Sequence, residues 1–284
     1  MFSCRDYMDA TFCAEYTFST MNRERIAKED VRRFWEANPL SAAGIPFEPG
    51  TPEFFAEHTR LRELETSYET KLWAYNVEEA AGTQVCDVGC GNGYVTCQFA
   101  EAGANVVAVD LTERAVELTR ARLAQRGLTA EVRQADAEEL PFEDETFDTV
   151  VSFGVIHHTP DTEKAVKEFY RVLKPDGRLR LMLYHRNSFA YRALFPAKRR
   201  LQRGSRGQTA SDQVNAVDGP TNPLGKVYSK SEVRALLHLF TDIEFRTEEM
   251  FFNRARRVPA PLRKFIEKRW GWHLYIRAKK PTLE

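Results

Sequence analysis

The stretch from Gln84 to Cys97 constrains this chain more than any other part of its sequence. Its apolar start reads as a buried strand, and three glycines on alternate positions follow at once, Gly89, Gly91 and Gly93. Glycine lets the backbone adopt positive φ and approach a ligand closely. The pattern then becomes helical from Tyr94 to Ala102, so the loop is expected to end at a helix N-terminus whose free N–H groups face a bound molecule.

A second strand is expected at Asn105–Asp110, and it ends in a carboxylate. In a βαβ unit, an acid at this tip accepts hydrogen bonds from ribose hydroxyls, so the unit predicts a nucleoside-containing cofactor. The spacing is G-x-G-x-G, because Tyr94 stands where the dinucleotide fingerprint G-x-G-x-x-G has its last glycine. Asp87 places a carboxylate beside the loop, which disfavours a pyrophosphate and favours a positively charged cofactor.

Four motifs in this order resemble those of class I S-adenosylmethionine (SAM)-dependent methyltransferases: the glycine stretch, Arg133–Phe142, Thr146–His158 and Val166–Gly177. The resemblance covers about Gln84 to Leu183. It implies SAM as cofactor and S-adenosylhomocysteine (SAH) as product, with the adenine amino group at Asp136 and the ring beside the N–H of the next residue. It implies no metal. The cofactor-binding residues expected on this basis are Asp87, Gly89, Gly91, Gly93, Asp110, Leu111, Asp136, Ala137 and Phe153.

Alternating strands and helices favour a Rossmann-like α/β fold, doubly wound, with a mostly parallel seven-stranded sheet. The further strands are expected at 130–134, 147–152, 178–184, 241–247 and 272–277. Ligands of such sheets bind at the carboxyl ends of the strands. Residues 81–284 would form the SAM-binding domain.

Residues 1–80 are expected to form a helical arm and lid, with a short helix at 28–36 and a long one from about Glu53 to Ala80. The lid hypothesis places Trp35, Tyr68 or Tyr75 over the cofactor and acceptor. Its alternative is that these aromatic residues pack on the sheet.

A long segment, 185–228, separates the fifth strand from the next helix and is expected to be a cap insertion over the site. It contains the basic run Lys198, Arg199 and Arg200. That run fits an anionic acceptor, an RNA backbone or a membrane surface, or it is the solvated face of a helix.

The composition gives no strong nucleic-acid signal, because 41 basic residues balance 41 acidic ones. Charge is uneven along the chain, however: residues 254–280 carry ten basic residues and one acid. Three of the five cysteines fall within the glycine stretch, without the spacing of a disulfide framework or a metal site, which favours a cytoplasmic location. No apolar run approaches the length of a membrane span.

His157 and His158 are the first candidates for a general base, since an imidazole in the cleft would titrate near neutral pH. Tyr184 and His185, at the tip of the fifth strand, are the second candidates. The alternatives are that the histidines only bond to the following turn and that Tyr184 and His185 only pack at the strand end.

The sequence therefore predicts a methyltransferase that acts on O, N or C of a small or medium organic acceptor in a biosynthetic pathway. The core also resembles quinone-biosynthesis C-methyltransferases, from which the insertion and the basic C-terminal part depart. Two alternatives stay open. One is an RNA or peptide methyltransferase that uses the basic segments, and the other is a SAM-binding protein without catalysis.

Overall fold

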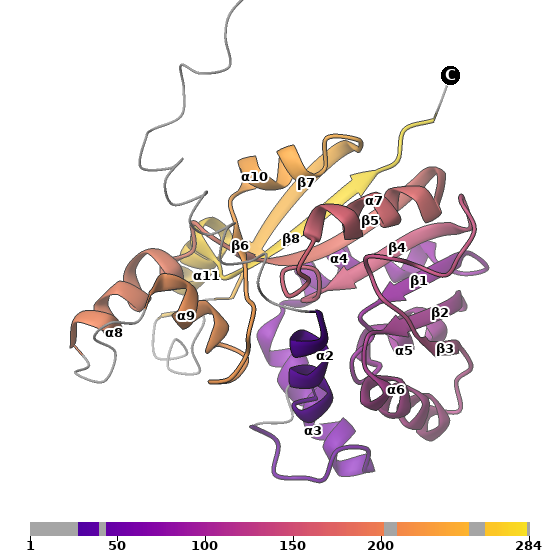
Figure 1. The fold of residues 1–284 in the computed structure, drawn as a ribbon, viewed down its shortest axis with the longest axis horizontal. Helices are drawn as coiled ribbons and strands as arrows, with labels where there is room; N and C mark the ends of the chain where they lie inside the picture. Colours follow the sequence, from indigo (N-terminus) through magenta and orange to yellow (C-terminus); the bar gives the residue numbers. More distant parts are fainter. Residues whose placement is uncertain (1–27, 40–43, 202–208, 250–258, 283–284) are drawn as a thin grey trace, which may run out of the picture.

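The structure is a computed structural model that describes residues 28–39, 44–201, 209–249 and 259–282. One mixed sheet forms its centre, with strands in the order β3-β2-β1-β4-β5-β8-β7 and a short β6 paired with β5 (Figure 1). The strands are β1 Gln84–Val88, β2 Asn105–Asp110, β3 Glu131–Gln134, β4 Phe147–Phe153, β5 Leu173–His185, β6 Val227–Tyr228, β7 Thr241–Glu248 and β8 His273–Lys279.

The predicted doubly wound, mostly parallel sheet is confirmed. Parallel pairing joins β1 to β2 and β4, β2 to β3, and β4 to β5, whereas β8 is antiparallel to both of its neighbours. The seven expected strands form the path, and the extra strand β6 has two residues that pair with the end of β5. The order reverses between β1 and β4, which is where a sheet of this kind opens a crevice for a ligand.

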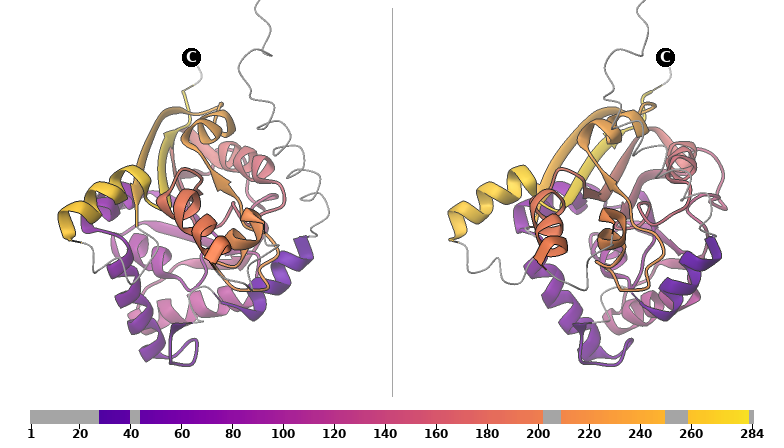
Figure 2. Two further views of the ribbon diagram at one scale, coloured as in Figure 1. Left: turned by 90° about the vertical axis from the view of Figure 1, so that its left-hand side faces the viewer. Right: turned by 60° about the vertical axis from the view of Figure 1, so that its left-hand side comes forward.

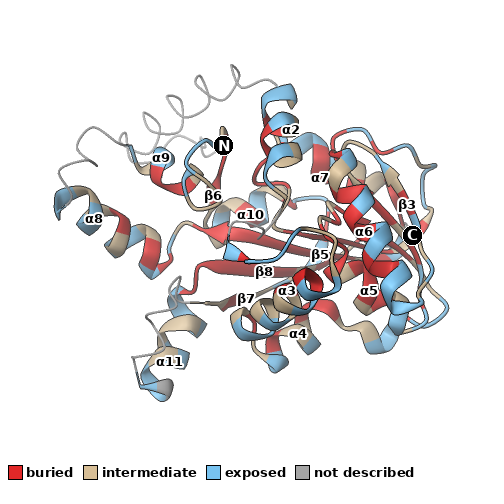
Figure 3. Ribbon diagram, turned by 90° about the horizontal axis from the view of Figure 1, so that it is seen from below, coloured by how far each residue is buried: buried red, intermediate tan, exposed pale blue. Residues whose placement is uncertain are grey.

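Helices cover both faces of the sheet. They are α2 Lys28–Ala37, α3 Pro52–Glu65, α4 Tyr68–Tyr75, α5 Tyr94–Glu101, α6 Glu113–Arg126, α7 Thr162–Val172, α8 Phe195–Leu201, α9 Ala210–Asn215, α10 Lys230–Leu236 and α11 Ala260–Trp270, with short helical turns η2 Val77–Glu79 and η3 Ala190–Leu194. Figure 3 shows that the strands are largely buried, whereas α8 and α11 have long solvent-exposed faces.

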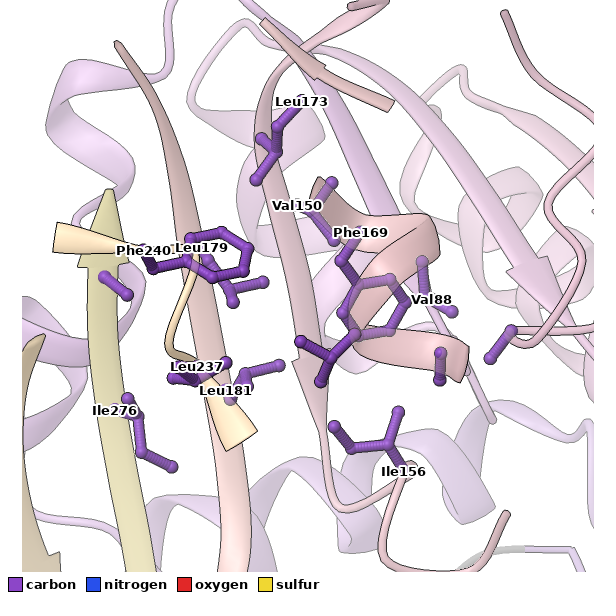
Figure 4. Packing of buried hydrophobic residues seen from close by; sticks show 14 of the residues in the cluster. Val88, Val150, Ile156, Phe169, Leu173, Leu179, Leu181, Leu237, Phe240 and Ile276 are labelled. Atoms are coloured by element: carbon purple, nitrogen blue, oxygen red, sulfur yellow. The ribbon is translucent and has the colours of Figure 1, made fainter. Parts of the chain in front are cut away.

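Two groups of apolar side chains fill the layers on either side of the sheet. On one face α7 and α10 pack over β1, β4 and β5, as Phe169, Val150 and Leu181 illustrate in Figure 4. On the other face α4 and α5 pack over the same strands through Tyr75 and Phe99, among others. Because these layers fix the strands, the loops at the carboxyl ends of β1, β2 and β4 have rigid supports.

The prediction of one long helix from Glu53 to Ala80 is wrong, because the chain forms α3, α4 and η2 there instead. Thr66 adopts an extended conformation between α3 and α4, and its buried hydroxyl lies 3.0 Å from the hydroxyl of Tyr275. Ser67 then caps α4 by accepting a hydrogen bond from the Thr70 N–H. The start of α3 agrees with the expectation, since Thr51 is the N-cap and Pro52 follows it.

Residues 185–228, which were expected to form a cap insertion, contain η3, α8, α9 and β6, and α8 and α9 lie next to each other outside the sheet (Figures 1 and 2). Residues 1–27 and 40–43 of the expected N-terminal arm and lid lie outside the described residues, as do parts of the basic segments at 202–208 and 250–258. Among the residues that are described, no helix combines the length and apolar character needed to cross a bilayer.

Candidate cofactor and active site

The glycine loop joins β1 to α5 at the carboxyl edge of the sheet. Gly89 has φ of +80°, and a Cβ atom there would overlap the side chain of Val155, so a larger residue does not fit. Its N–H donates to the Val109 carbonyl at 2.7 Å, which ties the loop to β2. Gly93 has φ of +77° and is the N-cap of α5. The sequence thus folds here into a strand, a tight loop and a helix as predicted.

Asp110 at the tip of β2 is the organising carboxylate of this edge. Its Oδ2 accepts the Gly91 N–H at 3.0 Å, and its Oδ1 accepts both the N–H and the hydroxyl of Thr112 at 3.0 and 2.8 Å. Burial raises the pKa of Asp110, although the bonds from Thr112 and Gly91 oppose that shift. A carboxylate has about four acceptor positions. Oδ2 therefore keeps capacity for one more donor, which fits a ribose hydroxyl.

A cavity that is partly open to solvent adjoins these groups. Seven of the nine expected cofactor residues line it: Gly89, Gly91, Asp110, Leu111, Asp136, Ala137 and Phe153. Gly91 has φ of +58° and lines the cavity with its backbone, because it has no side chain. The residues at the cavity thus fit a nucleoside cofactor.

The other two expected cofactor residues do not line the cavity. Asp87 is buried behind the loop and accepts a hydrogen bond from the Thr96 hydroxyl at 2.6 Å. Burial raises the pKa of Asp87 to about 7, with the nearby charge of Asp110 adding to the shift and Thr96 opposing it. Gly93 lets α5 pass close to α6, since a Cβ atom there would lie 3.1 Å from the Thr119 Cα.

Helix α2 supplies one wall of the cavity through Lys28, Val31 and Trp35. The Lys28 ammonium pairs with Asp136 and also lies 2.8 Å from the Glu138 carboxylate. At the other end of the helix, Glu36 accepts the first free N–H groups of α6, from Glu113 and Arg114, at 3.1 and 3.0 Å. Both contacts attach α2 to loops at the carboxyl edge of the sheet.

The aromatic residues expected in a lid lie in different places. Trp35 lines the cavity, and its ring lies 5.0 Å from that of His158. Tyr75 is buried and stacks on Phe153 at 4.9 Å, whereas Tyr68 is 69% exposed. Trp35 alone of the three has the position that a lid residue requires.

The two candidate histidines have different surroundings. His158 lines the cavity, its Nδ1 lies 2.6 Å from the Leu224 carbonyl, and its Nε2 lies 3.6 Å from an Asp218 carboxylate oxygen. His157 is fully buried, does not line the cavity, and has no hydrogen-bond partner for either nitrogen among the described residues. Burial lowers the pKa of both rings, but Asp218 and the Leu224 carbonyl counteract the shift at His158.

Tyr184 and His185 lie at the tip of β5, as expected, but neither lines the cavity. The Tyr184 hydroxyl donates to Asp218 at 2.7 Å, and its ring centroid lies 4.0 Å from that of His157. His185 is buried, with Nδ1 3.0 Å from the Gly271 carbonyl. The structure thus brings His157, His158 and Tyr184 together, whereas His185 contacts the two residues before β8.

Lys28, Glu138 and Asp218 were not among the site residues predicted from the sequence. Lys28 begins a helix that is far along the chain from Asp136, and Asp218 lies inside the insertion without a recognised motif. No sequence signal paired either one with its partner. Among the described residues, no group of three or more His, Cys, Asp or Glu side chains could hold a metal ion.

The chain is similar in sequence to known methyltransferases. Residues 86–181 match a family model described as a methyltransferase domain. A ubiquinone/menaquinone biosynthesis C-methyltransferase of Idiomarina loihiensis is 40% identical over 107 residues, covering 36% of this chain and 42% of that protein. A ubiquinone biosynthesis O-methyltransferase of Pseudomonas entomophila is 33% identical over 120 residues, covering 42% and 52%. The chain thus spans about half, or less, of the length of these curated relatives.

Two solved structures share the fold. One is the magnesium protoporphyrin IX methyltransferase of Synechocystis with bound SAH, with a TM-score of 0.59 and 17% identity, covering 89% of this chain and all of that one. The other is a SAM-dependent methyltransferase of Methanosarcina mazei, with a TM-score of 0.56 and 20% identity, covering 77% and 100%. At these identities the likeness concerns the fold alone.

Proposed function

We propose that this chain, whose residues 86–181 match a methyltransferase domain, transfers a methyl group from SAM to O, N or C of a small or medium organic acceptor. The observation that carries the proposal is one cavity lined by Asp110 and Asp136 and also by His158. A nucleoside held by the two carboxylates would place its reactive end on the histidine side.

The expected roles of the lining residues follow from their chemistry. Oδ2 of Asp110 accepts a ribose hydroxyl, Asp136 accepts the adenine amino group, and Gly89 and Gly91 let the cofactor approach the backbone. Residues 1–80 act as a lid through α2, residues 81–284 form the catalytic domain, and 185–228 form its cap. SAM supplies an activated methyl group, so alignment with the acceptor contributes on the order of 7–11 kcal/mol to lowering the barrier.

His158 is the best-placed general base. A carbonyl oxygen can only accept, so the Leu224 carbonyl fixes the proton on Nδ1 and leaves Nε2 free to take a proton. Proton removal from a hydroxyl, amine or acidic carbon would add about 10²–10⁴-fold in rate. An acceptor that needs no deprotonation would use the alignment alone.

A small acceptor is supported by the walls of the cavity and by the relatives. Helix α2 covers the cavity, and the basic residues of α8 do not line it. The two curated relatives are named for ubiquinone and menaquinone biosynthesis, which favours a biosynthetic role with a small organic substrate. An anionic acceptor, RNA or a peptide at the basic segments, and a non-catalytic role remain the alternatives to be tested.

Calorimetric titration with SAM, SAH and NAD tests the cofactor part. SAM and SAH should bind with micromolar affinity and NAD should not, and Asp110→Asn should weaken SAM binding by about 1–3 kcal/mol, or about 5- to 150-fold. Asp148→Asn is the matched control, since Asp148 accepts the Gln84 N–H and pairs with Lys174 without lining the cavity. Tighter binding of NAD than of SAM would contradict the proposal.

Transfer of labelled methyl from SAM to a panel of phenols, quinols, amines and acidic carbon compounds tests the acceptor part. Labelling of a small acceptor supports the proposal. Labelling of RNA or protein alone supports the macromolecular alternative, and SAM binding without transfer to any member of these classes supports the non-catalytic one.

A further inference from the structure

One loop of the cap insertion contacts both ring nitrogens of His158. The loop is Asp218–Leu224, with the sequence Asp-Gly-Pro-Thr-Asn-Pro-Leu. Its last carbonyl lies 2.6 Å from Nδ1, and the carboxylate at its start lies 3.6 Å from Nε2. The ring of Trp35 of α2 also packs against the imidazole, with 5.0 Å between the ring centroids. Both polar contacts of the imidazole therefore come from the insertion.

Internal hydrogen bonds hold this loop in shape. The Asn222 N–H donates to the Gly219 carbonyl at 3.1 Å, and its side-chain amide donates to Asp218 at 3.4 Å. The Asn222 side-chain oxygen in turn accepts the Leu224 N–H at 3.2 Å. One asparagine thus fixes the spacing between the carboxylate and the carbonyl that face His158.

The chain after the loop is attached to the histidine turn itself. The Lys226 N–H donates to the His157 carbonyl at 2.9 Å. Its ammonium donates to the carbonyls of Thr159 and Pro160 at 2.6 and 2.8 Å. These bonds keep the loop and the turn in one register, so the position of Asp218 relative to Nε2 is built into the fold.

We propose that Asp218 is a positioning residue that acts through His158 in the methyl transfer proposed above, on which this inference rests. The Leu224 carbonyl selects the tautomer with the proton on Nδ1, and Asp218 supports the positive charge that Nε2 acquires. As the acceptor atom bonds to the methyl carbon, the bond from that carbon to sulfur breaks and its electron pair stays on sulfur. The acceptor's proton moves to Nε2, and the resulting imidazolium faces the Asp218 carboxylate.

The charged groups around His158 and Asp218 determine whether Asp218 raises or lowers the pKa of His158. Burial lowers the pKa of His158 and the Lys226 ammonium adds to this, whereas Asp218 is the carboxylate that raises it. The rings of His157 and Tyr184 also face it, at 4.2 and 5.8 Å. Burial raises the pKa of Asp218, while His158 and the Tyr184 hydroxyl lower it. Removing the carboxylate leaves only the Leu224 carbonyl to oppose burial and Lys226, so the proton affinity of His158 must fall.

The test is a pH titration of the full chain labelled with ¹³C at histidine Cε1 and aspartate Cγ, followed by NMR. A His158→Gln spectrum assigns the His158 signal. Asp218→Asn should lower its midpoint by at least about one pH unit, which is tenfold in proton affinity. Asp242→Asn is the matched control, because Asp242 is an exposed residue of β7 with φ of +52°, a conformation that asparagine tolerates, and it should leave the midpoint unchanged.

An unchanged His158 midpoint in folded Asp218→Asn would overturn the inference. Should that variant fail to fold, the wild-type spectra decide, because a coupled pair titrates with shared midpoints. Common midpoints of His158 Cε1 and Asp218 Cγ support the inference, and independent ones overturn it. Neither measurement requires methyl transfer, so a failure here is distinguishable from a failure of the proposed function.

Discussion

The Lys28 ammonium lies 2.8 Å from the Glu138 carboxylate and also pairs with Asp136, so one side chain joins α2 to the loop after β3. The Glu138 side chain is 5% exposed and that of Lys28 35%. Burial lowers the pKa of Lys28, but its bonds to both carboxylates outweigh this and raise the value overall. The contact lies on the wall of the cavity, where it holds α2 in place.

Replacing Lys28 by Met should weaken SAM binding. The change releases the first turn of α2, and Val31 and Trp35 then lose their fixed position at the cavity. Because Lys28 is partly exposed, solvent screens the pair, and we expect a modest loss of about 2- to 5-fold. Titration calorimetry measures it. Arg33→Met is the control, since Arg33 is exposed on the same helix and lies 3.8 Å from Asp30. Tighter SAM binding by Lys28→Met would mean that Lys28 competes with the adenine for Asp136.

Local patterns predict the parts of this site that lie at strand ends. The glycine loop, Asp110 and His158 follow directly from where apolar runs stop, because the carboxyl ends of parallel strands meet at one edge. The N-cap of α6 at Thr112 and its C-cap at Gly127 are equally local features. Each of these features depends on residues that are close together in the sequence.

Contacts between distant segments were not predictable. The break at Thr66 places the Thr66 hydroxyl 3.0 Å from that of Tyr275, which is 209 residues away, and no local pattern indicates this contact. Asp218 and Lys28 are ordinary charged residues in sequence, and only the packed insertion and α2 bring them to His158 and Asp136. For Asp87, the position in the chain was predicted correctly but the hydrogen-bond partner was not. Its place beside the glycine loop was predicted, but the side chain turns to Thr96 behind the loop.

Asp87 should make the protein less stable as the pH rises from about 4 to 7. With the pKa raised to about 7, the folded state keeps a proton that the unfolded state has already released, so the free energy of unfolding falls across this window. The loss should be on the order of 2–4 kcal/mol. Asp87→Asn should remove this component. Urea unfolding of both proteins at several pH values measures the difference, and parallel curves would show that Asp87 ionises normally.

The basic run of α8 should not contribute to binding of SAM or of a small acceptor. Lys198 and Arg200 are exposed, and neither they nor Arg199 line the cavity. The triple change to Ala should leave SAM affinity and the acceptor KM within about twofold, as expected for exposed charges distant from a site. An increased KM would identify an anionic acceptor that reaches α8. A steep salt dependence of RNA binding that flattens in the variant would support the RNA alternative instead.

His158 and His157 should differ in their effect on catalysis, although they are adjacent in sequence. Nε2 of His158 has no proton in the tautomer that the Leu224 carbonyl selects, and the ring lines the cavity. His158→Gln at saturating SAM should therefore lose at least about a hundredfold in kcat, with SAM affinity retained. His157→Gln is the natural control, because that ring is buried behind His158 and does not line the cavity. It should retain kcat within about tenfold.

The log of kcat in the wild type should rise with pH up to the pKa of His158 and then level off, since the neutral ring is the active base. If both variants retain kcat, catalysis rests on alignment alone, and the pH profile should then be flat through that range.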